Sequence, residues 1–324
     1  MEVNTAKELH TGLKEDKDIE LTSDINFSHM LFDFIPFYGK KYKWSQIKEY
    51  NGVLDGNGYE LQDFIRINTR FVFKLNGEIK NLCINNTFYS QCDVGKLCEV
   101  NDGKIVNCTI ESDFQVTLDN VCRRSYDGTE RTSGVICHYN NGLIEDCDIS
   151  NTEVNSWGCG GKCKDNYNKV GGICIVNDGT IQDCTVGDSK LAGEKYSSGI
   201  CDENTGVISE CDIHETVLDS EESVNGICRE NGGEISECTI QNSELLSERG
   251  SFGICRKNKT EISDCEIKNS ELSSEISSVG VSNSNYGNIK GVEITETEYG
   301  GRDVTGLVNS NDGNIDRCIL NNNT

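Results

Sequence analysis

Apolar, cysteine and asparagine positions recur together along much of this chain, with one shared period of 27 residues. Two cysteine columns keep that period and lie ten residues apart: Cys174, Cys201, Cys228 and Cys255, then Cys184, Cys211, Cys238 and Cys265. Columns of Asn, Ile, Leu and Gly keep step, beginning at Asn177, Ile181, Leu191 and Gly199. Several residue classes that recur at one spacing indicate a repeat architecture.

The same unit extends in both directions with small insertions, and about nine Asn/Gly turns can be counted if the weaker Asn76-Gly77 is included. Each unit alternates as Ile-x-x-Cys-x-Ile, which suits a short strand with one buried face. A leucine-rich repeat would need several Leu at fixed offsets, and these units have one. The pattern therefore predicts an all-β parallel β-helix, or solenoid, of about nine coils. Ile and Cys should point into a narrow lumen, with charged residues outside.

Three parts are predicted along the chain. Residues 1–70 form an N-terminal cap and the first strands, residues 71–320 form the repeat domain, and residues 321–324 form a polar tail. Helix formers after Thr5, with Leu9 and Leu13 one turn apart, predict a short helix that covers the first coil. Such a cap shields strand edges that would otherwise invite aggregation. Two insertions, 111–133 and 155–168, break the period and are expected on the loop side, where binding is often found.

Aromatic and basic residues are interleaved between residues 27 and 50. Two interpretations remain open for this segment. The rings can pack onto the first coils as an aromatic cap, or Tyr38, Tyr42 and Trp44 can stack on sugars or on a partner protein. Trp157, in the second insertion, is a further candidate for binding.

Composition and charge narrow the class of partner. Only 35% of residues are hydrophobic and one is Pro, which disfavours a large globular core but permits an ordered backbone. With 30 basic and 54 acidic residues, the net charge of −24 argues against nucleic acid or an anionic membrane as partner. No stretch approaches the roughly 20 apolar residues of a membrane span, and the start lacks a secretory signal pattern. We therefore expect no membrane insertion, and either no export or a trimmed chain.

One segment, from Lys169 through Cys174 and Asn177 to Cys184, resembles the GLUG-type repeat of bacterial and archaeal adhesin-like surface proteins. Upstream, Asp24-Ile-Asn-Phe27 and Asp55-Gly-Asn-Gly58 resemble segments that open right-handed β-helices. The resemblance covers about residues 18–320. It implies a right-handed parallel β-helix, which the N-terminal helix and aromatic cap predicted above would cover, and a surface or virion location. The Asp-Gly-Asn-Gly segment also occurs in pectinase-like β-helices, as a structural turn.

The 18 cysteines admit three interpretations. Zinc sites usually combine two Cys-x-x-Cys pairs, and the columns lack such pairs. A disulfide needs Cβ atoms about 3.5–4.5 Å apart, whereas in-register neighbours lie near the rung spacing of about 4.8 Å. We therefore predict buried free thiols, which survive best in a reducing compartment such as the cytoplasm. Cys159 and Cys163, in a Gly-rich loop, are the candidate disulfide.

Two polar columns accompany the cysteines. The Asn column from Asn101 to Asn311 is typical of an asparagine ladder, in which each amide bonds to the next coil. An acidic column stands just before the second cysteine: Asp146, Asp183, Glu210, Glu237 and Asp264. Like charges about 4.8 Å apart repel unless they are solvated or bridged. This column is therefore either a solvated face or a weak cation-binding site.

No catalytic constellation emerges from the sequence. The four histidines, His10, His29, His138 and His214, are scattered, and none recurs beside an acid pair. No Gly-rich phosphate loop, nucleophile elbow or metal-ligand motif is present, so no cofactor is expected.

Three functions remain as hypotheses. The first is a non-catalytic structural and interaction protein, a rigid rod that presents loops to a protein or a glycan. The second is a carbohydrate-active enzyme with an unrecognised carboxylate site, and the third is a spike or fibre component of a virion or appendage. After Leu320 only four polar residues follow. The last coil is therefore expected to be open, and to support self-association or docking.

Overall fold

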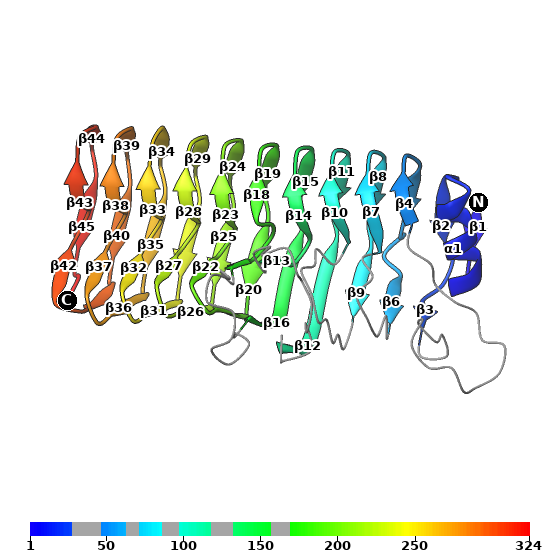
Figure 1. Ribbon diagram of the computed structural model, residues 1–324, viewed down its shortest axis with the longest axis horizontal. Coiled ribbons are helices and arrows are strands. Elements are labelled where there is room, and N and C mark those ends of the chain that lie inside the picture. Colours follow the sequence, from blue (N-terminus) through cyan, green and yellow to red (C-terminus); the bar gives the residue numbers. More distant parts are fainter. Residues whose placement is uncertain (28–46, 63–70, 86–96, 118–131, 157–168) are drawn as a thin grey trace, which may run out of the picture.

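The computed structural model of the chain describes residues 1–27, 47–62, 71–85, 97–117, 132–156 and 169–324. Its strands stack side by side as the successive coils of one rod, with α1 at the N-terminal end (Figure 1). Strand pairing between coils is parallel wherever the structure describes it. The predicted all-β parallel β-solenoid is confirmed, and the stack is consistent with a right-handed β-helix.

Sheet A is twelve-stranded within the described residues. Its strands, in spatial order, are β1 (Glu2–Val3), β2 (Ile19–Leu21), β5 (Val53–Asp55), β8 (Glu78–Lys80), β11 (Lys104–Val106), β15 (Leu143–Glu145), β19 (Thr180–Gln182), β24 (Val207–Ser209), β29 (Glu234–Ser236), β34 (Glu261–Ser263), β39 (Asn288–Lys290) and β44 (Asn314–Asp316).

Sheet C is ten-stranded over the same part of the chain. Its strands are β4 (Ile47–Tyr50), β7 (Val72–Leu75), β10 (Cys98–Asn101), β14 (Cys137–Asn140), β18 (Val176–Asn177), β23 (Cys201–Asn204), β28 (Cys228–Asn231), β33 (Cys255–Asn258), β38 (Ser282–Asn285) and β43 (Val308–Asn311). Strand β4, followed by Asn51-Gly52, adds a turn that the sequence pattern did not reveal.

Sheet B has two branches that share the long strand β16. The first branch contains β3 (Ile25–Asn26), β6 (Glu60–Gln62), β9 (Cys83–Asn85), β12 (Thr109–Thr117), β16 (Asp148–Ser156), β20 (Thr185–Gly187), β25 (Asp212–His214), β30 (Thr239–Gln241), β35 (Glu266–Lys268), β40 (Glu293–Thr295) and β45 (Ile319–Asn321). The second branch contains β21 (Lys190–Gly193), β26 (Val217–Ser220), β31 (Glu244–Ser247), β36 (Glu271–Ser274) and β41 (Glu298–Gly300).

Sheet D completes each coil and is seven-stranded among the described residues. Its strands are β13 (Thr132–Gly134), β17 (Lys169–Gly171), β22 (Tyr196–Ser198), β27 (Ser223–Asn225), β32 (Gly250–Phe252), β37 (Ser277–Val279) and β42 (Asp303–Thr305). A complete coil therefore runs through sheet D, sheet C, sheet A and the two branches of sheet B, as β22 to β26 do.

The lumen is filled by the columns that the sequence pattern predicted to face inward. Ile208, Cys211 and Ile213 are buried in one coil, and Glu210 between them is exposed. The register is strict, because Ile208 pairs with Ile181 on one side and Ile235 on the other. Each fully buried Ile contributes roughly 1.5–3 kcal/mol of transfer free energy, so the stacked columns are the main source of stability.

Two kinds of turn residue let the chain bend without opening the stack. The acidic column occupies left-handed positions, with φ near +52° at Asp183 and +54° at Glu210. At the turn between sheets C and A, a Cβ on Gly206 would lie 2.0 Å from the carbonyl oxygen of Gly179, so only Gly fits. Backbone approach between coils therefore favours glycine in this column, although one coil has Thr260 there, whose hydroxyl donates to the Gly233 carbonyl.

An amide ladder runs through eight successive coils along the inner edge of sheet C. Each Asn donates from Nδ2 to Oδ1 of the next, over 2.7–2.9 Å: Asn101, Asn140, Asn177, Asn204, Asn231, Asn258, Asn285 and Asn311. The predicted asparagine ladder is confirmed. It satisfies buried turn groups and fixes the register of neighbouring coils.

Helix α1 (Ala6–Lys14) packs against β2 and β4 at the N-terminal end, as the sequence predicted. Thr5 caps it, since the Glu8 N–H donates to the Thr5 hydroxyl. Leu9 and Leu13 are fully buried. Tyr50 is also buried, and its hydroxyl donates to the Lys17 carbonyl over 2.9 Å. Phe27 and Tyr50, the aromatic residues of segment 27–50 that the structure describes, are therefore both packed in the core.

The last coil leaves its apolar side chains exposed. Val304, Ile315 and Leu320 are each 38–49% exposed, whereas their counterparts one coil earlier, Ser278, Ile289 and Ile294, are buried. No helix in the described part of the chain is long and apolar enough to cross a membrane.

Candidate functional site

Most of the predicted binding residues fall outside the described part of the chain. Tyr38, Tyr42 and Trp44 lie in segment 28–46, and Trp157 lies in segment 157–168 with Cys159 and Cys163. Their roles in binding and in a disulfide therefore remain predictions. The fourteen cysteines in the described part of the chain are free, and those of the two columns stack in register, as Cys201, Cys228 and Cys255 do. Cys92 and Cys122 lie outside the described residues.

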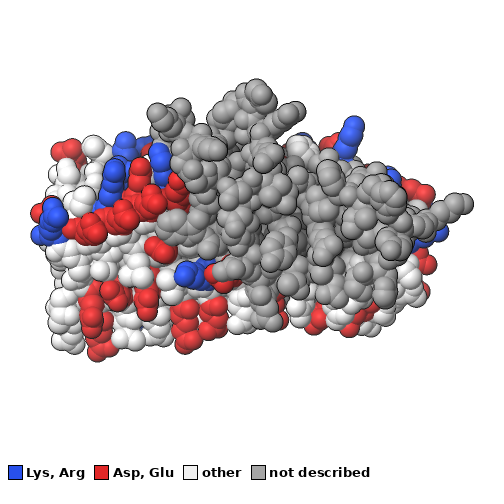
Figure 2. Space-filling view, turned by 60° about the horizontal axis from the view of Figure 1, so that its bottom comes forward, with Lys and Arg blue, Asp and Glu red and all other residues white. Residues whose placement is uncertain are grey.

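The acidic column is a row of solvent-exposed turn residues. Asp183 and Glu237 flank Glu210, and together they raise the pKa of its carboxyl above its ordinary value. That shift shows the mutual repulsion expected from the sequence. Within the described residues, no group of three or more His, Cys, Asp or Glu side chains could hold a metal ion. Figure 2 shows acidic side chains in rows along the rod.

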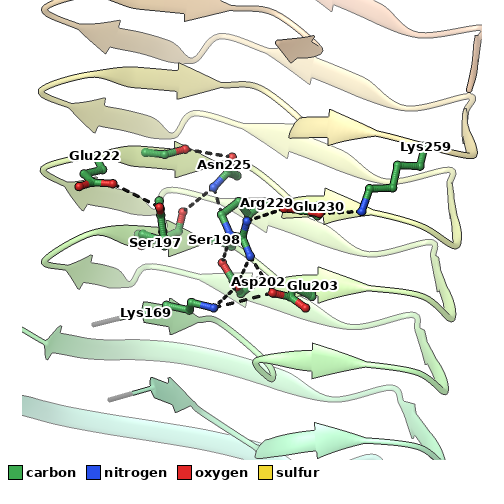
Figure 3. Close-up of polar contacts among 12 residues, drawn as sticks. Lys169, Ser197, Ser198, Asp202, Glu203, Glu222, Asn225, Arg229, Glu230 and Lys259 are labelled. Carbon is green, nitrogen blue, oxygen red and sulfur yellow. Dashed lines mark hydrogen bonds and ion pairs between the residues drawn. The ribbon is translucent and has the colours of Figure 1, made fainter. Parts of the chain in front are cut away.

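The most developed cluster of charges lies on the outer side of sheets D and C, across four successive coils (Figure 3). We call it the ion-pair lattice. Its members are Lys169, Asp202, Glu203, Arg229, Glu230 and Lys259. They come from β17, β23, β28 and the turn after β33. Three acidic and three basic side chains make the lattice neutral.

Asp202 is the centre of the lattice. Its side chain is only 1% exposed. Arg229 approaches it with two nitrogens, Nε to Oδ1 at 2.9 Å and Nη2 to Oδ2 at 3.1 Å. Lys169 Nζ lies 3.1 Å from Oδ2. A buried carboxylate is tolerated only when it is paired in this way.

Arg229 links Asp202 to the outer members of the lattice. It also donates to Glu203 and to Glu230, each over 2.7 Å, and lies 5.1 Å from the Tyr196 ring centroid. Burial acts to lower the pKa of Arg229, but Asp202 and the two glutamates outweigh burial and raise it. Because its donors are already engaged, this guanidinium is held for structure rather than offered to an anion.

Glu230 ends the lattice next to Lys259, whose Nζ lies 2.7 Å from Oε2. This hydrogen bond, helped by Arg229, lowers the pKa of Glu230. Lys259 and Glu203 are each 45% exposed, so solvent screens the rim far more than the centre. The lattice ties four coils together from outside, as the amide ladder does from inside.

A second group of titratable side chains lies on the outer face of sheet B. Asp148, Thr185 and Asp212 are in register on three successive coils. His214 lies against Gly187, because a Cβ there would come within 2.3 Å of its ring. Partial burial raises the pKa of Asp148, although His214 acts to lower it. Asp212 Oδ1 is buried with no hydrogen-bond partner among the described residues.

This group places a single histidine, His214, within electrostatic reach of Asp148, although no histidine recurs from coil to coil. Sequence reasoning missed the group formed by Asp148, Asp212 and His214. The insertion at 155–168 lies between Asp148 and the other two residues, so their spacing is not a multiple of 27. The signal that could have found it is Gly187, which lies between Ser150 and His214 in one column. Because Gly187 has no side chain, it leaves room for the His214 ring.

A buried hydroxyl ladder in the turns between the two branches of sheet B was also missed. The Thr216 N–H donates to Ser243 Oγ at 3.2 Å, and the Ser243 N–H donates to Ser270 Oγ at 3.3 Å. Ser189, Thr216, Ser243 and Ser270 are spaced by 27 residues, so the sequence did contain this signal.

Comparisons with known proteins do not assign a function to these surfaces. No protein-family model and no curated protein matches the chain. A solved structure titled "L. reuteri 53608 SRRP" is 14% identical, covering 98% of this chain and 99% of that chain, with a TM-score of 0.33. At this score the match carries no argument about function, and the resemblance to GLUG-type repeats remains a prediction.

Proposed function

We propose that the protein is a non-catalytic β-helical rod whose outer faces bind another protein or a glycan. The observation that carries this proposal is the unbroken amide ladder, which joins eight coils into one register. A chain that is fixed coil to coil holds its surface side chains at constant spacing. Such preorganisation lowers the ordering cost of binding.

The ion-pair lattice supports the same role. It ties four coils together on the outer surface, and its central Arg229 and Asp202 satisfy each other rather than a ligand. Buried ion pairs contribute little net stability compared with apolar packing, but loss of one partner is costly. The lattice therefore fixes the geometry of this face without itself forming a reactive site.

A carbohydrate-active enzyme is the second candidate, and the sheet B group favours it. Asp148 has a raised pKa, and Asp212 lies two coils away, with His214 nearby. Two rungs separate the backbones of the two acids by about 9.6 Å, just beyond the upper end of the range for inverting glycosidases. Inverting glycosidases place their carboxyl groups about 6.5–9.5 Å apart. Asp148 would then be the general acid and Asp212 the base.

Incubation with a panel of acidic and neutral polysaccharides separates the two candidates. Retention of a polysaccharide without new reducing ends is the result expected for a binding rod. Release of new ends, abolished by Asp148→Asn and Asp212→Asn but not by Glu293→Gln on the same face, would establish the enzyme instead.

We further propose that a second copy of the chain covers the exposed last coil. Ile315 and Leu320 are exposed there, and each continues an inward column. Sedimentation over a concentration series, with and without a helical cap fused after Thr324, tests this. Self-association that the cap abolishes is expected. A monomer in both cases, with no gain in stability from the cap, would contradict it.

A further inference from the structure

We propose that the outer face of sheet C between β33 and β43 binds a polysaccharide that carries carboxylate groups. We call this surface the cationic strip. Its members are Arg256, Lys257, Asn283, Ser284, Tyr286, Asn309 and Ser310. The inference rests on the proposed function and names the class of ligand and the surface that binds it.

The charge of the strip is opposite to that of most of the rod. Strands β33, β38 and β43 contain no Asp or Glu, although acidic residues outnumber basic ones by 54 to 30 in the chain. By contrast, the second branch of sheet B carries Glu244, Glu271 and Glu298 in register. The nearest carboxylate in the column of Lys257 is Glu230, which is already paired with Arg229 and Lys259.

Two cations are available on the strip. Arg256 is exposed and forms no ion pair within the described residues. Lys257 is half-buried, and its Nζ lies 5.5 Å from the centroid of the Tyr286 ring, which is itself 52% exposed. An Arg fork matches a carboxylate, and an exposed Tyr ring offers an apolar face with a polar edge. Together they can hold a uronic acid by its charge and by its ring.

Small polar side chains continue the strip at one-coil intervals. Asn283 and Asn309 follow Arg256 in register, and Asn309 Nδ2 donates to Asn283 Oδ1 over 3.1 Å. Ser284 and Ser310 follow Lys257 in the same way. Amides and hydroxyls supply both donors and acceptors, which is what sugar hydroxyls require.

The composition of the strip favours a glycan over a protein. A stable protein interface needs a buried apolar core, and Tyr286 is the strip's one large apolar side chain. The negative charge on the other faces does not prevent binding here. At physiological ionic strength the Debye length is about 8 Å, so charges on distant faces are largely screened. Affinity should nevertheless fall as salt is added.

The test is equilibrium binding of the full chain to alginate, a polymer of uronic acids, and to its neutral propylene glycol ester. The double variant Arg256→Gln/Lys257→Gln removes both cations of the strip. The matched control, Lys104→Gln/Lys290→Gln, makes the same change in net charge on sheet A. Unfolding curves of both variants establish that they fold.

We expect alginate to bind more tightly than the ester, and the strip variant to lose roughly tenfold or more in affinity while the control retains it. Equal binding of alginate and ester, or an equal loss in both variants, would overturn the strip as the site. Failure of the natural chain and of the control variant to bind alginate would also overturn it. That result would leave the proposal of a protein-binding rod intact. Cleavage of alginate would contradict the proposed function instead. Equal affinity for duplex DNA, lost in the same variant, would show general anion binding and overturn the glycan assignment.

Discussion

Asn101 stacks on Leu75, and this pair marks the place where the amide ladder begins. Asn101 Nδ2 donates to Asn140 Oδ1 at 2.8 Å, but its own Oδ1 is buried without a hydrogen-bond partner in the described part of the chain. Leu75 occupies the position from which the preceding coil would donate. An apolar residue is therefore accepted at the start of the ladder, at the cost of one unsatisfied acceptor.

This arrangement predicts that an amide inside the ladder matters more than one at its end. Asn231→Leu removes donors to Asn258 and to the Glu261 carbonyl, and leaves Asn204 without its acceptor. We expect a loss of about 2 kcal/mol or more in the free energy of unfolding. Asn311→Leu, at an exposed position, should cost less than about 1 kcal/mol. Denaturant unfolding of both variants measures the difference, and equal losses would contradict the ladder's role.

Two substitutions two residues apart test which side chains point into the lumen and which point to solvent. Ile208→Asp places an unpaired carboxylate in the lumen, and should cost more than about 4 kcal/mol or prevent folding. Glu210→Gln should be neutral or slightly stabilising at pH 7, because it relieves repulsion from Asp183 and Glu237. A Glu210 variant as unstable as the Ile208 variant would show that the assignment of inward and outward positions is wrong.

The same glutamate predicts a dependence on pH. Because the folded pKa of Glu210 lies above its ordinary value, the ionised carboxyl destabilises the fold at neutral pH. That penalty is relieved as pH falls through the raised pKa. The advantage of Glu210→Gln over the natural chain should therefore shrink in acid. Unfolding curves of both proteins from pH 7 to pH 4 measure this difference in stability. A difference that grows as the pH falls would contradict the repulsion at Glu210.

The ion-pair lattice predicts a steep contrast between its centre and its rim. Asp202→Asn removes the one buried carboxylate that Arg229 and Lys169 share, and should cost about 3 kcal/mol or more. Glu203→Gln, at a side chain 45% exposed, should cost less than about 1 kcal/mol. Thermal or urea unfolding distinguishes them. Similar, small losses of unfolding free energy in both variants would mean that the lattice does not stabilise the fold.

Thiol reactivity should follow burial. Burial raises the pKa of Cys255 to about 12, so its thiolate is scarce at pH 8 as well as inaccessible. Cys318 and Cys83 are half-buried and should be alkylated first in the folded protein. Mass spectrometry of peptides alkylated before and after denaturation measures the order. Labelling of Cys255 at the rate of Cys318 in the native state would contradict the packed lumen.

The repeat itself was predictable from sequence, because each coil repeats one local solution: Ile208 and Cys211 inward, Glu210 outward, Asn204 in the ladder. Strict spacing makes these positions visible without any structure. The ion-pair lattice was not predictable in the same way. Asp202 and Arg229 lie in one column, 27 residues apart, but carry opposite charges, and Lys169 comes from another column, so the lattice produces no repeating residue class.

The cationic strip escaped notice for a related reason. Arg256 follows Arg229 in its column, whereas Lys257 follows Glu203 and Glu230, so no regular charge pattern marks the strip, and an overall charge of −24 conceals it. Register supplies the missing information, since it places Asn283 and Asn309 beside Arg256. The aromatic and insertion residues that the sequence singled out, such as Trp44 and Trp157, lie outside the described residues and remain untested.

The most direct test of a non-catalytic binding rod is the chain length of a polysaccharide that the protein has retained. Alginate bound to the immobilised protein is held for many hours, eluted with salt, and compared by size-exclusion chromatography with alginate kept in buffer. Our account predicts recovery of the polymer at its original length. Recovery of shortened chains, prevented by Asp148→Asn, would contradict it and make the rod an enzyme.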